Sequence, residues 1–119
     1  MIFCRISILF FRGIIMRNQT KKYIQQLQNV MHSLSLWQSV PPVADVFLSE
    51  EPFSIDTMSA QEWLQWVFIP RMLALLESGA PLPNQIAISP YIEEAMKEFD
   101  ELEQLLSPLI ALEELLKNQ

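Results

Sequence analysis

Apolar residues recur every three or four positions along most of this chain, which is the spacing of one face of an α-helix. The first stripe, within residues 21–37, comprises Tyr23, Ile24, Leu27, Val30, Met31, Leu34 and Trp37. The last comprises leucines 102, 105, 106, 109, 112, 115 and 116. The Asn-Gly and Asp-Gly dipeptides typical of β-hairpins are absent. The pattern predicts an all-α fold.

Local signals mark where the helices begin and end. Pro41 stops the first helix, since proline donates no backbone hydrogen bond. Ser59 and Glu62 have the spacing of a capping box, and Gly79 suits the left-handed residue after a helix. Ser89, followed by a proline, predicts another N-cap. We expect a compact bundle of about four main helices, joined by Pro-rich loops, with a short helical turn over residues 43–48.

Two features of the C-terminal third leave alternatives open. Asp100 and Glu103 could form a second capping box after a bend, or the helix could run straight through. Pro108 predicts a kink in the last helix, or a restart at Ser107.

The helix that begins at Ser59 is apolar on nearly all sides. On a wheel of ~100° per residue, Trp66, Ile69 and Leu73 lie beside Glu62 on the polar side. One interpretation is a central helix covered by its own loops. The other is an exposed patch of these three residues that binds another protein, since tryptophan is enriched at interface hot spots.

Pro70 and Arg71 are unusual inside the same helix. Pro70 has no amide to offer the Trp66 carbonyl, so we expect a bend. The wheel puts Arg71 on the apolar side, where a buried guanidinium needs a carboxylate. We expect an ion pair, with Glu93 or Glu94 as the partner, or an arginine that snorkels to solvent. The candidate cleft for a small ligand comprises Trp63, Pro70 and Arg71.

Composition narrows the possible functions. The 119 residues fit one domain, and 14 acidic against 8 basic residues give a net charge of −6. That sign disfavours direct contact with nucleic acid or with an anionic membrane. A single histidine, His32, and a single cysteine, Cys4, exclude a catalytic triad, a multi-histidine metal site and an internal disulfide. We therefore expect no metal, no cofactor and no enzymatic activity.

Residues 1–16 differ from the rest of the chain. They are apolar but contain Arg5 and Arg12, so they make a poor membrane span and a poor signal peptide. We expect a disordered extension or a mis-assigned start, with translation beginning at Met16. A membrane-touching arm and a packed segment are the alternatives. Residues 17–119 are expected to form one helical-bundle domain.

The stretch "EWLQWVFIPRM", residues 62–72, resembles the YqcC-like family of small bacterial helical proteins. The chain also has the family's "PF" at 52–53, "DTM" at 56–58 and "PLP" at 81–83, and "SPY" at 89–91 is similar to its pattern. The segment before Met16 and Ser107-Pro108 depart from that pattern. The resemblance implies a cytoplasmic helical bundle of uncharacterised activity, whose genes often lie beside one for a tRNA pseudouridine synthase.

These features favour a small non-enzymatic interaction module, a helper near tRNA modification whose partner is another protein. The alternative is a small-ligand-binding helical protein. Membrane contact is expected only if residues 1–16 are part of the translated protein. The sequence leaves the oligomeric state open.

Overall fold

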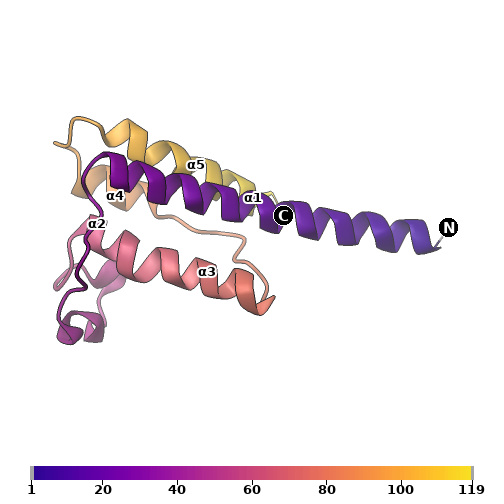
Figure 1. The fold of residues 1–119 in the computed structure, drawn as a ribbon, viewed down its shortest axis with the longest axis horizontal. Helices are drawn as coiled ribbons and strands as arrows, with labels where there is room; N and C mark the ends of the chain where they lie inside the picture. The colour runs from indigo at the N-terminus through magenta and orange to yellow at the C-terminus, as the bar shows by residue number, and fades with distance from the viewer. Residues whose placement is uncertain (1, 119) are drawn as a thin grey trace.

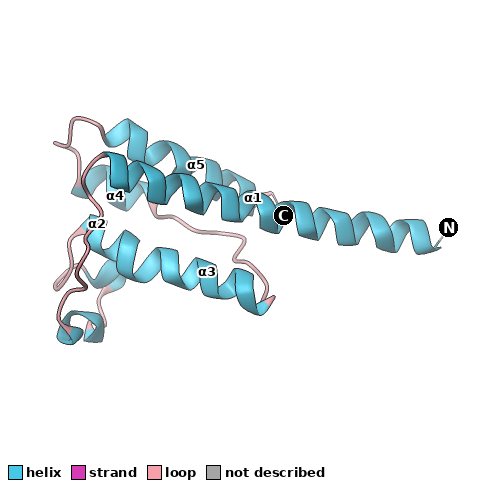
Figure 2. Ribbon diagram, viewed as in Figure 1, coloured by secondary structure: helices cyan, strands magenta, loops and turns pink. Residues whose placement is uncertain are grey.

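The computed structural model describes the backbone of residues 2–118 and the side chains of residues 13–118. The helices are α1 (Ile2–Ser33), α2 (Ala60–Trp63), α3 (Ile69–Ser78), α4 (Ser89–Ala95) and α5 (Leu102–Lys117), with the π-turn η3 (Leu64–Phe68) between α2 and α3. Two 3-10 turns, η1 (Ala44–Leu48) and η2 (Pro52–Ser54), lie between α1 and α2. Residues 2–118 contain no strand, which confirms the all-α prediction (Figure 2).

The helices pack in an antiparallel arrangement along the length of the bundle. α1 lies against α5 and also contacts α3, and both of these helices run opposite to α1 (Figure 1). The predicted stripes form the core, where Ile24, Leu27, Leu105, Leu109 and Leu112 are almost completely buried. Amphipathic stripes on neighbouring helices therefore account for the fold, since each one removes its apolar face from water.

α1 ends earlier than the sequence predicts. The helix stops at Ser33, and Ser35 adopts a left-handed conformation with a φ of 60°. The amide of Leu36 donates to the carbonyl of Met31, and that of Ser35 donates to His32, the pair of bonds that defines a Schellman motif. Leu36 and Met31, the positions that usually form the apolar contact of this motif, both pack in the core region. The sequence did not predict this helix end, four residues before Trp37, because serine occupies the left-handed position that usually holds glycine.

The predicted capping box is confirmed at the start of α2. The Ser59 hydroxyl accepts from the amide of Glu62, and the Glu62 carboxylate accepts from the Ser59 amide at 2.9 Å. The hydrogen bond from the Ser59 amide outweighs partial burial and lowers the pKa of Glu62, with further contributions from the hydroxyl and from Gln38. At the other end, Gly79 has a φ of 73°, as its predicted left-handed position requires.

α4 begins at Ser89 as predicted, but a different residue caps it. The Ser89 side chain makes no cap to its own helix, and its hydroxyl donates to Glu113 of α5 at 2.6 Å. The Glu113 carboxylate also accepts from the amides of Ile88 and Ser89, at 2.8 and 2.7 Å. A carboxylate at a helix N-terminus satisfies amides that lack a partner within the helix. This contact joins the 79–88 loop and α4 to the last helix.

The structure also decides between the alternatives that the sequence left open for the C-terminal third of the chain. The chain leaves helical geometry after α4 and begins α5 at Leu102, although its N-cap residue, Glu101, makes no side-chain cap. The bend is therefore present, and a capping box from Asp100 and Glu103 is absent. α5 continues through Pro108, whose ring is buried, so no restart occurs at Ser107.

The backbone of residues 2–16 forms the first part of α1, which extends beyond the bundle (Figure 1). The interpretation of residues 1–16 as an extension separate from the helical-bundle domain stays a prediction. The assignment of the start to Met16 stays a prediction.

We expect Glu62→Gln to lower the free energy of unfolding by roughly 0.5 kcal/mol at neutral pH, because an amide accepts weaker hydrogen bonds than a carboxylate. The pKa of Glu62 is lower in the folded chain than in the unfolded chain. Its stabilisation is therefore present above the unfolded pKa and is lost as the pH falls through the folded pKa.

Urea unfolding followed by circular dichroism, from neutral pH to roughly pH 3, measures this dependence. The difference between wild type and variant should shrink as the pH falls. Glu114→Gln, at an exposed position of α5, is the control and should leave stability unchanged. A difference for Glu62→Gln that is independent of pH would contradict this role.

Candidate functional site

The helix that follows Ser59 contains one turn of π-helix immediately before Pro70. The amide of Ile69 donates to the carbonyl of Leu64, five residues earlier, where an α-helix would use the residue four earlier. Proline in a helix interior has no amide, and its ring clashes with the carbonyl four residues before it. The wider turn accommodates the proline, so the irregularity expected at Pro70 takes the form of a π-turn.

The π-turn explains why the helical wheel placed two residues, Ile69 and Arg71, on the wrong side of the helix. One extra residue in a turn rotates everything after it by about 100° relative to a regular helix. Ile69 consequently faces the core, with 2% of its side chain exposed, and does not belong to an exposed patch. Arg71 faces solvent instead of the apolar side.

The predicted ion pair of Arg71 is therefore wrong. Among the side chains of residues 13–118, the ion pair found is between Lys97 and Glu94, whose Nζ and Oε1 atoms are 3.0 Å apart. Glu93 is exposed and makes no ion pair with Arg71 within that range. A guanidinium in water needs no carboxylate partner, because it is not desolvated.

A hydrogen-bonded cluster around Gln38 holds the chain beside this turn. Gln65, 3% exposed, accepts from the Gln38 amide at 2.8 Å and donates to the Gln38 carbonyl at 2.7 Å. The side chain of Gln38 in turn accepts from the Trp66 indole at 2.8 Å and donates to Glu62 at 3.3 Å. The Gln65 amide thus pairs with both backbone groups of one residue, as a neighbouring strand would.

The three residues of the predicted cleft do lie together. Trp63, Pro70 and Arg71 line one depression of about 420 Å³, along with Trp66 and Val67. The opposite wall comes from the segment between α1 and α2, which supplies Phe47, Ser49, Glu51, Pro52, Phe53 and Ser54. The 79–90 loop contributes no described residue to the lining of this cleft.

Stacked aromatic rings support one side of this cleft. Phe53 lies parallel to Tyr91, with ring centroids 4.2 Å apart, and meets Trp63 edge-on at 4.9 Å. Trp63 in turn stacks on Phe68 at 5.8 Å. Burial raises the pKa of Tyr91. The rings fix Phe53 in a left-handed conformation, with a φ of 58°, that a bulky residue rarely adopts.

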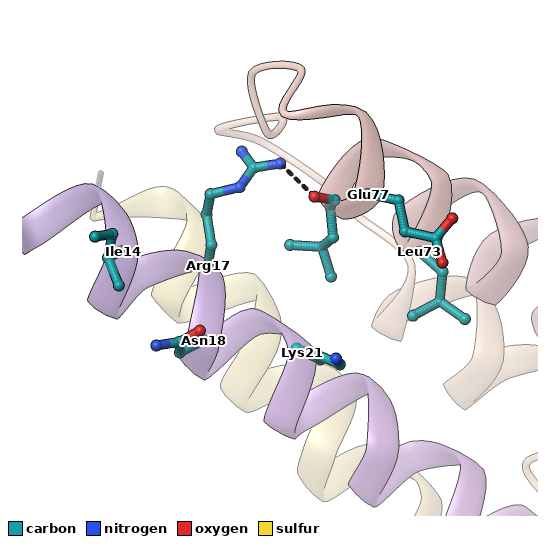
Figure 3. A pocket seen from close by; sticks show the side chains of 7 residues that line it. Ile14, Arg17, Asn18, Lys21, Leu73 and Glu77 are labelled. Carbon is teal, nitrogen blue, oxygen red and sulfur yellow. Dashed lines mark hydrogen bonds between the residues drawn. The ribbon is translucent and has the colours of Figure 1, made fainter. Parts of the chain in front are cut away.

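Leu73, the third residue of the predicted patch, lies in a different hollow of about 410 Å³ between α1 and α3. Figure 3 shows Arg17 reaching from α1 toward the end of α3, beside Leu73 and Glu77. The Arg17 guanidinium donates to the carbonyls of Leu75, Leu76 and Ala80, at 2.6, 3.2 and 2.9 Å. Leu75 and Leu76 are in the last turn of α3, whose carbonyls lack a helical partner, and Ala80 lies two residues beyond the end of the helix.

The predicted surface of Trp66, Ile69 and Leu73 is thus not one patch. Trp66 lines the cleft, Ile69 is in the core, and Leu73 lines the second hollow. The roles of Gln38, Gln65, Arg17 and Glu113 were not predicted from the sequence. Gln65 offered one signal, since an uncharged polar residue beside two tryptophans in a mostly apolar helix must find a hydrogen-bond partner when buried.

The described residues contain neither a group of metal ligands nor a helix that could span a membrane. Within them, no three His, Cys, Asp or Glu side chains are grouped so that they could hold a metal ion. No helix of the described chain has the length and apolar character needed to cross a membrane.

The fold and the cleft define a small all-helical protein with a surface depression lined by tryptophan, proline and arginine. A family model described as "tRNA pseudouridine synthase C", DUF446, matches residues 19–115. The chain belongs to this family. The solution NMR structure of protein YqcC from E. coli has a TM-score of 0.76 and 34% identity, and covers 85% of this chain and 87% of that one. The resemblance noted in the sequence is confirmed.

Two further relatives bear on function. An uncharacterized protein of Haemophilus influenzae is 76% identical over 103 residues, which are 87% of this chain and 97% of that protein. A protein of Pectobacterium carotovorum subsp. carotovorum, named tRNA pseudouridine synthase C, is 48% identical over 67 residues. Those residues are 56% of this chain but 18% of that longer protein.

We expect Gln65→Met to lower the free energy of unfolding by about 2–3 kcal/mol, because it leaves the Gln38 amide and carbonyl without their partners at nearly unchanged volume. Urea unfolding followed by tryptophan fluorescence measures this loss. Gln61→Met, one turn earlier, is the matched control, since the Gln61 side chain makes no hydrogen bond within residues 13–118. Equal stability of the two variants would show that the pairing with Gln38 contributes little.

Proposed function

We propose that this chain is a non-enzymatic helper protein that binds an enzyme of tRNA modification. The observation that carries the proposal is the Pectobacterium protein, in which a sequence 48% identical to part of this chain makes up 18% of a polypeptide named tRNA pseudouridine synthase C. Placing two modules on one chain raises their effective concentration, which favours pairs that act together. The description of the matching family, "tRNA pseudouridine synthase C", points to the same process.

The charge of the chain supports an enzyme, rather than RNA, as the direct partner. The net charge is −6, and from Met72 onward two basic residues stand against nine acidic ones. A surface that binds RNA must replace phosphate counterions with cations, so an acidic surface repels RNA. An enzyme that acts on tRNA presents the complementary positive surface.

The cleft favours recognition over catalysis. Neither histidine nor cysteine occurs among its described lining residues. His32 instead stacks on Trp37, with ring centroids 4.7 Å apart. Tryptophan and arginine, which do line the cleft, are the residue types most enriched at interface hot spots.

The direct test mixes this chain with the tRNA pseudouridine synthase of the same organism. We expect one complex by size-exclusion chromatography with light scattering, with a Kd of about 10 μM or tighter, as is usual for a specific pair. The Pectobacterium protein, which carries its own related segment, is the control and should bind more weakly because that segment competes. Separate elution of chain and enzyme at about 100 μM each would refute the proposal.

The second candidate function is small-ligand binding, which the shared cleft of Trp63, Pro70 and Arg71 favours. Arg71 offers an unpaired cation within the described residues, and Trp63 and Trp66 offer apolar ring surface beside it. An anionic ligand with a planar apolar part fits that combination.

A screen of anionic aromatic metabolites, read by tryptophan fluorescence and thermal shift, tests this candidate. In a Trp37→Phe background the two remaining tryptophans line the cleft, so a bound ligand should change their emission. Arg71→Gln should weaken binding about tenfold. Lys97→Gln, at a position that follows α4 and does not line the cleft, is the control and should leave binding unchanged. The absence of any hit at millimolar ligand would count against this function.

A further inference from the structure

We infer that the loop formed by residues 40–56, together with the cleft beside it, docks a basic segment of a partner protein through apolar anchor side chains. This inference rests on the proposed function and names the surface that such a partner would contact. The loop lies at the end of the bundle opposite to the N-terminus (Figure 1).

The 40–56 loop exposes more large apolar side chains than any other part of the described chain. Eight such side chains are exposed among residues 13–118, and five belong to this loop, with exposures from 43% to 76%. They are Val40, Val43, Phe47, Leu48 and Ile55. Apolar side chains concentrated in one exposed segment are typical of a site that another surface covers.

The loop is held in place by hydrogen bonds even though its apolar side chains face water. The Gln65 amide fixes Gln38 at its start, and the Thr57 hydroxyl donates to the Val46 carbonyl at 2.7 Å near its end. The Ser49 hydroxyl donates to Asp56 across the loop. A surface that is already ordered loses less conformational entropy when a partner binds.

Charge identifies the chemistry of the partner. Asp45, Glu50, Glu51 and Asp56 all belong to the loop and are all exposed. Neither lysine nor arginine occurs between Lys22 and Arg71, so the loop has no basic side chain of its own. Acidic groups interspersed with exposed apolar groups complement a segment in which lysine or arginine alternates with apolar residues.

The cleft supplies the position for an apolar anchor. Phe47 and Glu51 of the loop form one wall, and Trp66 and Pro70 form the other. Its volume of about 420 Å³ accommodates one or two large side chains. Arg71, the basic residue among its described lining, favours a carbonyl or carboxylate of the partner on that wall, which fixes the direction of the bound segment.

The experiment compares variants of the full chain for binding to the pseudouridine synthase. We expect Leu48→Ser with Ile55→Ser to weaken the Kd at least tenfold, while Ile110→Ser, an equally apolar but remote change on α5, leaves it unchanged. Glu50→Gln with Glu51→Gln should weaken binding and flatten its salt dependence, whereas Glu103→Gln with Glu114→Gln should not. All of these positions are exposed, so the variants are expected to fold.

The outcomes separate this inference from the proposed function. If wild type binds the enzyme and the loop variants bind equally well, the docking surface is wrong and the proposed function stands. If wild type does not bind the enzyme, the proposed function fails.

The loop is tested independently with an 18-residue helical peptide of lysine and leucine as the probe. NMR shift changes at residues 40–56 and around the cleft, lost in Leu48→Ser with Ile55→Ser, would support the inference. Changes confined to the acidic residues 93–103, or no saturable binding, would overturn it. A homodimer that the same variant dissociates would assign the loop to a second copy and also overturn it.

Discussion

The pairing of the Gln65 side chain with the backbone of Gln38 is the contact on which the arrangement around the cleft depends. It joins the chain leaving α1 to the helical segment that carries Trp63 and Trp66. Because Gln65 is buried, its amide could not lose these partners without leaving polar groups unsatisfied. The start of the 40–56 loop, one wall of the cleft and the orientation of the Trp66 indole all follow from that constraint.

Pro70 supplies the second constraint, since it converts one turn of a regular helix into a π-turn. The turn redistributes the side chains that follow it between core and solvent. Ile69, which a regular helix would expose, becomes part of the core. Arg71, which a regular helix would bury, lines the cleft. A single residue without a backbone amide thus changes both the composition of the core and the charge of the surface.

Several features of the fold that depend on local sequence could be predicted, although the end of α1 at Ser33 and the π-turn before Pro70 were not. The capping box at Ser59, the left-handed Gly79 and the leucine stripe of α5 each involve residues within a few positions of one another. The parts that depend on distant partners could not. Arg17 contacts the end of α3 about sixty residues later, and Glu113 caps a helix that precedes it. Trp63, Pro70 and Arg71 could be grouped from one helix, but the opposite wall of the depression that they line required the tertiary structure.

The unusual conformation of Phe53 has a consequence for dynamics. Its positive φ is unfavourable by itself, and it persists because Tyr91 and Trp63 hold the ring. The order of the loop therefore depends on its contacts with the bundle, whereas the most buried core residues lie on the helices. Opening of this loop and global unfolding are accordingly expected to be separate events with different free energies. Hydrogen exchange at the loop would then report the availability of the surface rather than the stability of the protein.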